Sequence, residues 1–440
     1  MSDTRLLAAD GTPLKRKLAQ SLFRTKLRTF GLVCPLLALI ISAFVIPIVF
    51  MLSASVYDDR YASLMPKSTI AVSEWDGESP VTEDMAAAMV ADLIIAKEQK
   101  TIGRVANRVN REFSGATSLF KSTARSAKKF EPPYLEALEN KDKKWQNIEM
   151  WQAIKVASKT YTLGYVANAL DMRVKATGGF EPQDELRQIH ITLFMRTIEI
   201  SFIVTVACLL LGYPVAYLMA NLPLRTSNLL LILVLMPFWT SLLVRTTAWI
   251  AMLQGQGVMN DLFVVFGLAT DDDRFSLIYN KTGTLIAMTH IMLPFMIMPL
   301  YSVMKTISPA YVRAAKSMGA TNWTAFWRVY FPQSIPGIGA GSLLVFILAI
   351  GYYITPALVG GQDGQMISNI IDFHMRRSLN WNLAAALGLV LLVVSCLTTN
   401  PEEPPIVSFT GVGPPNTNTC GMPRKKSMLS SSLCSLMKQC

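Results

Sequence analysis

The chain has 440 residues and a formal net charge of +11, and 16% of its residues are charged, whereas globular proteins have about 25% charged residues. Together with a hydrophobic fraction of 51%, this composition predicts membrane spans. The basic residues flank apolar runs instead of gathering on a soluble face, which argues against nucleic-acid binding. The cysteines and histidines lack metal-ligand spacing, so we expect no metal site and no disulfide framework.

The first apolar run, 31–57, is long enough to cross a membrane. In the preceding segment, 1–30, basic residues far outnumber acidic ones, so the positive-inside rule predicts a cytoplasmic N-terminus. Because a long polar segment precedes the run, we expect a retained helix and not a cleaved signal peptide.

A soluble stretch, 58–190, lies between the first and second spans, and we expect it to be a periplasmic insertion. Apolar residues recur in it at helical spacing, for example at Met85, Met89 and Leu93. This pattern favours a mostly helical insertion. An extended, poorly ordered loop remains the alternative, because Ser, Lys and Glu are plentiful there.

Further apolar runs reach the length of about 20 residues that a span requires, and they lie at 192–220, 228–253, 283–304 and 335–359. With the N-terminus inside, the loop at 305–328 is cytoplasmic, and it carries Lys and Arg but no Asp or Glu. The acidic residues at 271–273 then lie outside. Charge and topology therefore agree.

A sixth apolar run, 383–397, has only about 15 residues and is short for a span. The remaining segment, 398–440, is rich in Pro and Ser, and we expect it to be a disordered and atypical tail. An ending of this kind is consistent with a reading-frame error or a truncation.

The loop between the fourth and fifth spans has the most informative sequence. Pro309 is suited to the first turn of a helix, and Gly319 is suited to the end of one. A second short helix is expected from Asn322 onward, stopped by Pro332 and Pro336. The sequence thus predicts a helix, a glycine bend and a second helix beside the membrane.

Two interpretations of this loop remain open from physics alone. Small side chains at Ala314 and Ala315 allow close approach, and Trp323, Phe326 and Trp327 are anchors of a kind enriched at protein interfaces. This combination favours a helix that fits a groove on a partner. The alternative is an amphipathic helix that rests on lipid headgroups.

A specific spacing in the loop is carried by Arg313, Ala314, Ala315, Gly319, Val329 and Pro332. It resembles the EAA loop of binding-protein-dependent importer permeases. Other stretches resemble the spermidine/putrescine branch of that family: LLLGYPVAYLMA at 209–220, PFWTSLLVRTTAW at 237–249 and LLVFILAIGYYITPALVGG at 343–361. The resemblance covers 190–397 and hence an entire transmembrane core.

The resemblance implies an all-α polytopic protein of the bacterial inner membrane, with the permease core of a type I ABC importer. That core has a six-helix plan, here with the last helix cut short and a helical external insertion added. The implied partners are a cytoplasmic ABC ATPase dimer, a second permease subunit and a periplasmic solute-binding protein. The chain itself would be a non-catalytic transport subunit without a cofactor, and it contains no GxxxxGKS/T phosphate loop.

Three features depart from the family pattern. Arg313 occupies the place of the motif's glutamate, so a salt bridge from that carboxylate to the ATPase does not carry over. The insertion at 58–190 is longer than the usual external loop. The last helix of the family normally continues well past Leu397.

Three ionisable side chains fall inside predicted spans and are candidates for lining the solute pathway: Glu199, Arg245 and His290. At 1.5 Å per residue they lie at a similar depth, about 10–12 Å from the outer surface, which would allow Glu199 to pair with Arg245. Alternatively, Arg196 pairs with Glu199 on one helix, Arg245 extends toward the headgroups and His290 serves packing.

The sequence leaves alternatives open for both the substrate and the function. The resemblance to polyamine permeases implies a small cationic solute such as spermidine or putrescine, yet related permeases carry other solutes. A secondary transporter is one rival function, although we find no inverted repeat of the kind expected for it. A membrane-anchored receptor that binds through its external insertion is the other.

Overall fold

The computed structural model describes the backbone of residues 14–399 and every side chain from Thr29 to Thr398, and the secondary structure of these residues is helical apart from one two-stranded hairpin. Within them, the helical segments long and apolar enough to cross a membrane are Thr29–Ser53, Glu185–Asn221, Lys281–Thr306, Asn322–Ile350 and Trp381–Thr398. A bent helix pair, Leu224–Trp239 with Leu242–Val265, gives a sixth if it is counted as one span. The chain is therefore a polytopic helical membrane protein.

The first span belongs to a helix that begins earlier than expected. It comprises α1 (Leu14–Ile40), a π-helical segment η1 (Ile41–Val45) and α2 (Ile46–Ser53). We predicted the span at 31–57, but the helix already starts at Leu14, because the Lys, Arg, Leu, Ala and Gln residues before the apolar run are good helix formers. Its apolar part ends at Ser53.

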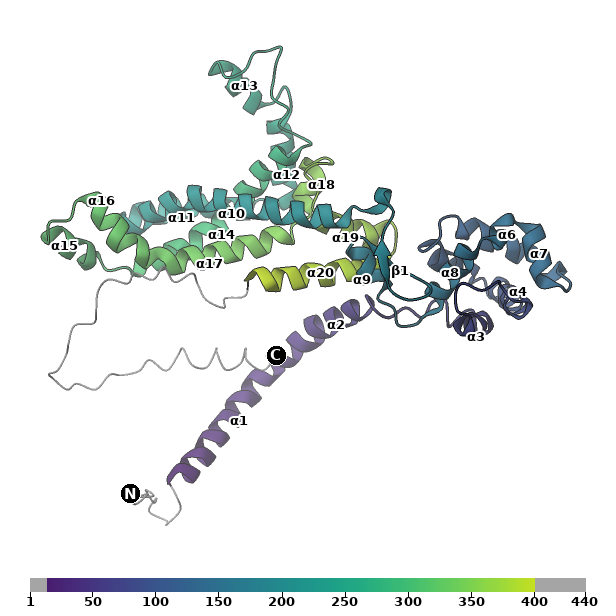
Figure 1. Cartoon of the computed structure of the whole chain (residues 1–440). Coiled ribbons are helices and arrows are strands. Elements are labelled where there is room, and N and C mark those ends of the chain that lie inside the picture. Colours follow the sequence, from purple (N-terminus) through teal and green to yellow (C-terminus); the bar gives the residue numbers. More distant parts are fainter. Residues whose placement is uncertain (1–13, 400–440) are drawn as a thin grey trace. The chain divides into compact units, whose positions relative to one another are not determined.

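The stretch 58–190 is a helical insertion with its own hydrophobic core, and the alternative of an extended loop is wrong. Met89 and Leu93 are fully buried there beside Trp145 and Trp151. The helices are α3 (Pro66–Glu74), α4 (Glu83–Glu98), α5 (Ile102–Asn110), α6 (Ala116–Ser126), α7 (Tyr134–Lys141), α8 (Ile148–Ser158) and α9 (Gly164–Ala169), with short 3₁₀ turns η2 (Ala127–Lys129) and η3 (Lys143–Gln146) (Figure 1).

A hairpin and an aspartate connect the insertion to the next helix. Strands β1 (Met172–Val174) and β2 (Phe180–Pro182) are antiparallel, and a 3₁₀ turn η4 (Glu185–Arg187) follows. The Asp171 carboxylate accepts hydrogen bonds from the backbone N–H of His190 at 3.0 Å and of Ile191 at 2.8 Å. It thereby satisfies free donors at the start of α10 (His190–Asn221) and places negative charge at that helix N-terminus.

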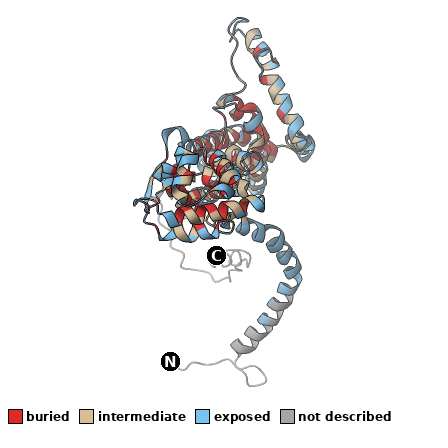
Figure 2. Cartoon of the chain, turned by 90° about the vertical axis from the view of Figure 1, so that its right-hand side faces the viewer, coloured by how far each residue is buried: buried red, intermediate tan, exposed pale blue. Residues whose placement is uncertain are grey.

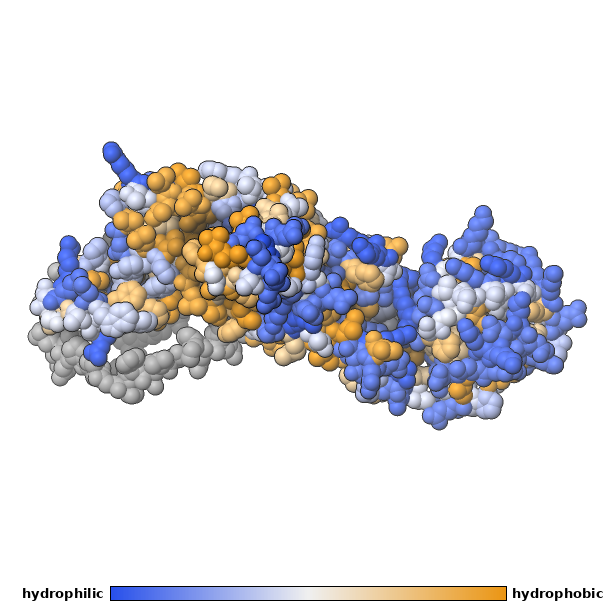
Figure 3. All heavy atoms as spheres, turned by 90° about the horizontal axis from the view of Figure 1, so that it is seen from above, coloured by the Kyte–Doolittle hydropathy of each residue, from blue (hydrophilic) through white to orange (hydrophobic). Residues whose placement is uncertain are grey.

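The centre of the membrane core consists of α10, α14 (Lys281–Thr306) and α17 (Phe331–Ile350), which lie side by side (Figure 1). Met288, Met292 and Met296 of α14 are buried among residues of the other two helices. Buried residues gather where helices face one another (Figure 2). Hydrophobic side chains cover much of the surface formed by the spans, whereas the surface of the insertion is mostly hydrophilic (Figure 3).

The third predicted span, 228–253, is not one straight helix. It comprises α11 (Leu224–Leu235), a 3₁₀ turn η5 (Met236–Trp239) and α12 (Leu242–Leu253), and α13 (Val258–Val265) follows. The two halves meet at an angle of 95°. Pro237 in the turn lacks a backbone N–H and therefore cannot donate the hydrogen bond that a continuous helix would have at this position.

The last two predicted spans also have different bounds. The fifth, expected at 335–359, ends at Ile350, and α18 (Ile354–Val359) is separate from it. After α19 (Ile367–Arg376), the sixth apolar run lies in α20 (Trp381–Thr399), whose 18-residue segment Trp381–Thr398 reaches the length of a span. Residues 1–13 and 400–440, including most of the expected tail, lie outside the described residues.

Candidate functional site

The loop after α14 begins with the expected helix, α15 (Pro309–Ser317). The Ser308 side chain caps it by accepting a hydrogen bond from the Ala310 N–H at 3.3 Å, and Pro309 occupies the first turn. Gly319 follows the helix with a φ of +89°, a left-handed conformation that a residue with a Cβ adopts only with strain. The predicted helix and glycine bend are thus present.

The second helix of the loop does not stop where we predicted. Helix α16 (Asn322–Ala325) passes through a π-helical segment, η6 (Phe326–Tyr330), directly into α17. Pro332 lies in the first turn of α17, where a missing N–H is tolerated, and Pro336 lies inside that helix without ending it. The loop is therefore continuous with a membrane span.

Aromatic side chains of the loop pack against the end of α10. The Tyr217 ring contacts the rings of Phe326 and Tyr330 at centroid distances of 5.6 and 5.1 Å. The Tyr213 hydroxyl lies 3.1 Å from the Ser334 hydroxyl, which adds a polar link between α10 and α17. Because aromatic pairs of this geometry are attractive beyond the area that they bury, the loop and the two spans should move together.

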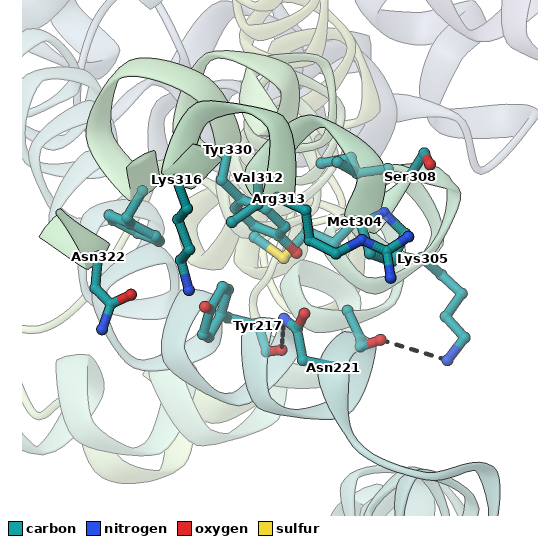
Figure 4. A pocket seen from close by; sticks show the side chains of 14 residues that line it. Tyr217, Asn221, Met304, Lys305, Ser308, Val312, Arg313, Lys316, Asn322 and Tyr330 are labelled. Carbon is teal, nitrogen blue, oxygen red and sulfur yellow. Dashed lines mark hydrogen bonds between the residues drawn. The ribbon is translucent and has the colours of Figure 1, made fainter. Parts of the chain in front are cut away.

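A cavity of about 700 Å³ lies between α15 and the ends of α10 and α14 (Figure 4). From α15, Lys316 projects toward Tyr217, and Arg313 projects toward Met304 and Lys305 (Figure 4). On its other side the Lys305 ammonium donates a hydrogen bond to the Ala220 carbonyl at 3.4 Å. None of its lining residues is acidic, so the site carries uncompensated positive charge.

Two of the predicted loop residues are buried or half-buried, and the other four are exposed. Ala315 is 6% exposed and packs toward the second half of the loop, and Val329 is half-buried. The exposed members of the motif are Arg313, Ala314, Gly319 and Pro332.

Among the three expected aromatic anchors, Trp323 is 70% exposed and Trp327 is 44% exposed, so both present apolar surface. Phe326 is different: it packs inward, against Tyr213 and Tyr217. Two aromatic side chains therefore remain for an external partner.

Glu199 and Arg245 do not form the ion pair that their similar depth would have allowed. Glu199 instead pairs with Lys281, at the first residue of α14, and the local alternative with Arg196 is not formed either, because Arg196 donates to the Gln362 carbonyl at 2.8 Å. No pattern in the sequence indicated the Glu199–Lys281 pair, since we predicted Lys281 to lie just before the fourth span. This pair joins the beginning of α14 to α10.

Arg245 has a structural partner that sequence reasoning missed. Its guanidinium donates hydrogen bonds to the carbonyls of Pro237 and, at 3.1 Å, Thr240. These carbonyls lie at the break between η5 and α12, where the Pro237 carbonyl also accepts a hydrogen bond from the Thr240 N–H at 3.3 Å. Inside a membrane, unpaired backbone groups are costly, so Arg245 stabilises the broken span.

His290 is paired with an aromatic residue of α12. The Trp249 indole N–H donates to its Nδ1 at 3.1 Å, and the two rings are 5.3 Å apart. Helices α12 and α14 are thereby joined. The structure thus does not bring the three candidate pathway residues into one ion-pair cluster. Glu199 lies at the contact of α10 with α14, whereas Arg245 lies on α12 one helical turn before Trp249, the partner of His290.

Comparison with known proteins identifies the family. Residues 212–400 match the family described as "Binding-protein-dependent transport system inner membrane component". Spermidine/putrescine transport system permease protein PotB of Escherichia coli (strain K12) is 32% identical over 209 residues, which are 48% of this chain and 75% of that protein. Molybdenum transport system permease protein ModB of Mycobacterium bovis is 27% identical over 207 residues, 47% of this chain and 76% of that protein.

Among solved structures, a bacterial alginate ABC transporter in complex with an alginate pentasaccharide-bound periplasmic protein is 20% identical, with a TM-score of 0.39, and covers 48% of this chain and 79% of that chain. The sequence relatives are the informative ones, because the 32% identity to PotB extends over three quarters of its length. This chain belongs to the binding-protein-dependent transport system inner membrane components, as an ABC permease of the spermidine/putrescine branch.

Proposed function

We propose that this permease is driven by a cytoplasmic ABC ATPase dimer that docks on the loop 305–335. The observation that carries the proposal is the continuity of that loop with the core. Helix α16 runs through η6 into α17 without interruption. The ring of Tyr217, on α10, packs against the rings of Phe326 and Tyr330 in the same segment. A displacement of α15 therefore reaches two of the three central helices.

The chemistry of the docking surface supports a partner with acidic groups. Arg313 and Lys316 line the cavity beside α15, and no acidic residue lies in 305–335. Complementary charge guides association and sets register. Since Arg313 replaces the glutamate of the family motif, the ATPase groove would present a carboxylate at that point. The exposed rings of Trp323 and Trp327 would supply the apolar part of the contact.

ATPase closure would act as a rigid-body rearrangement of the spans. The loop residues Arg313, Ala314, Ala315, Gly319, Val329 and Pro332 would form the coupling element, with Gly319 fixing the angle between the two halves. A second permease subunit would complete the solute pathway, and a periplasmic solute-binding protein would deliver the solute. In this arrangement the N-terminus and the loop lie in the cytoplasm and the insertion lies outside, in agreement with the charge distribution.

The substrate class that we favour is a polyamine such as spermidine or putrescine. It rests on the name of the 32% identical relative, PotB. The relative named for molybdenum transport shows that the wider family serves other solutes, so another small solute is the second candidate. Uptake of radiolabelled spermidine by proteoliposomes that contain the whole transporter would separate the two.

The docking proposal is tested by copurification of the cognate ATPase with the tagged full-length chain in mild detergent. We expect stoichiometric ATPase with the wild type and a loss of about tenfold or more with Arg313→Glu, because the reversal places like charges opposite each other. Lys121→Glu is the matched control: Lys121 is exposed on α6 of the insertion, so ATPase recovery should not change. No ATPase with the wild type would instead favour a secondary transporter or a membrane-anchored receptor.

A further inference from the structure

Helix α5 of the insertion has one basic face and one buried face. Arg104, Arg108 and Arg111 recur at intervals of three and four residues, which places them along one side of the helical turn. On the other side, Val105 and Val109 are fully buried in the core of the insertion. The hydrophobic core therefore fixes the direction in which the arginines point.

The basic face borders a cavity of about 530 Å³. On its opposite side lie the end of α19 and the turn that leads into α20. The lining residues are Arg60, Arg104, Asn107, Arg108, Asn110, Arg111, His374, Ser378, Leu379 and Asn380. Acidic residues are absent from this lining, although it contains arginines from two separate segments of the chain.

Protein carboxylates neutralise only part of this charge. Arg108 is 1% exposed, and its guanidinium forms ion pairs with Asp58 at 3.0 Å and with Glu112 at 2.7 Å. Arg60 is only loosely held by the same Asp58, at 3.7 Å. Two carboxylates thus face this group of arginines, and Asp58 is shared between two of them.

Within the part of the chain that the structure describes, the other two arginines form no ion pair with a carboxylate. Arg111 donates to the neutral hydroxyl of Tyr165 at 3.1 Å. Arg104 is exposed, and among the described residues its side chain forms no ion pair. Positive charge therefore remains in excess around the cavity, and a concave surface with charge of one sign concentrates ions of the other.

His374 lines the same cavity. Burial, followed by the charges of His190 and Arg111, lowers the pKa of His374 to about 4. The imidazole is therefore neutral at physiological pH. An anion in the cavity would oppose the effect of Arg111 on this group.

The cavity lies next to the ends of two predicted spans, α2 and α20. The Asn382 side-chain amide, at the start of α20, donates to the carbonyls of Ala54 at 2.8 Å and Tyr57 at 3.1 Å, just beyond α2. Exposed aromatic rings surround this junction: Tyr57 is 42%, Tyr161 74% and Trp381 43% exposed. Tyr and Trp are enriched at the headgroup level of a bilayer, and the cavity follows directly after these residues.

We propose that the α5 cavity binds a phosphate group, that of an anionic phospholipid headgroup, through Arg60, Arg104 and Arg111. Guanidinium groups donate paired hydrogen bonds that match phosphate oxygens. The lipid chains would lie against the exposed apolar surface of α2, where Ile48, Val49 and Phe50 are each more than half exposed. This site would tie the insertion to the membrane surface.

The proposal requires only that α2 and α20 cross a membrane, and it does not rest on the ATPase or the substrate. The test is native mass spectrometry of the full-length chain released from nanodiscs that contain phosphatidylglycerol. We expect a retained phosphatidylglycerol molecule with the wild type. Retention should fall about tenfold or more in the double variant Arg60→Gln, Arg104→Gln, because each loses hydrogen bonds to a charged group.

Arg125→Gln is the matched control, since Arg125 is exposed on α6 and does not line the cavity. The single variant Arg104→Gln covers the case in which the double variant fails to fold, because the Arg104 side chain has no protein ion pair to lose. Equal lipid retention in the arginine variants and the control would overturn the proposal. A second arm titrates inorganic phosphate: phosphate binding without any retained lipid would replace the lipid assignment with a site for free phosphate.

Discussion

Gly341 of α17 lies so close to α14 that a Cβ atom on it would stand 2.8 Å from the Met296 sulfur and 3.2 Å from the Met296 backbone oxygen. The substitution Gly341→Val should therefore force α14 and α17 apart. We expect a loss of about 1–3 kcal/mol in the free energy of unfolding, as for other overpacked cores. Thermal unfolding of the purified chain in detergent measures this loss.

Gly339 provides the matched control for that experiment. A Cβ atom on Gly339 would meet nothing within 4 Å, although it lies on the same helix. Gly339→Ala should therefore leave the melting temperature unchanged or raise it, because Ala is the better helix former. Equal destabilisation by both substitutions would show that the close contact with Met296 is not what matters.

Gly319 differs from Gly341 in that its surroundings are open. A Cβ atom would meet nothing within 4 Å, so its φ of +89° is the sole local constraint. Gly319→Val should strain the bend by about 1–3 kcal/mol, whereas Gly319→Asn should be tolerated, because Asn adopts left-handed conformations. We expect transport and ATPase copurification to fall with Val and to persist with Asn. The same loss with both variants would argue against a conformational cause.

Hydropathy predicted where most of the spans lie, but not the bend in the third span or the full length of the sixth. The requirement for about 20 apolar residues is a physical property of the bilayer, so runs such as 192–220 and 283–304 coincide with long helices. The break in the third span was missed, because proline inside a transmembrane helix does not always end it. Pro336 and Pro237 illustrate the difference: α17 continues through the first, and the helix bends at the second.

In the candidate site, too, some features could be predicted from the sequence and others could not. Local spacing was sufficient to predict α15 and the bend at Gly319, since caps and glycine conformations depend on neighbouring residues. Partners distant in sequence were not predictable in the same way. Nothing near Glu199 indicates Lys281, and nothing near His290 indicates Trp249, because these contacts form only when α10, α12 and α14 pack together.

His374 should make the stability of the chain depend on pH. Its pKa is lowered from 6.5 to about 4, first by burial and then by His190 and Arg111. Between these values the unfolded chain binds a proton that the folded chain excludes, so stability should fall as the pH falls from about 6.5 toward 4. Above this window, His374 is neutral in both states and contributes nothing.

Melting temperatures at pH 7.5 and pH 5, compared between the wild type and His374→Gln, test this dependence. The variant should lose less stability at the lower pH, because glutamine does not titrate and still reaches Ser378, which His374 contacts at 2.8 Å. Identical pH slopes in the two proteins would contradict the assignment to His374.

The ion pair of Glu199 with Lys281 connects α10 to the first residue of α14, and the two side chains are 55% and 34% exposed on the isolated chain. If transport moves these helices relative to each other, the pair must be intact in one of the two conformations. Glu199→Gln and Lys281→Gln should each reduce uptake by about two- to fivefold, because a partly exposed ion pair contributes up to about 1 kcal/mol. The exchanged pair, Glu199→Lys with Lys281→Glu, restores the attraction and should recover much of the uptake in proteoliposomes. Normal uptake by both single variants would mean that the pair is only a surface contact, of the kind that contributes little.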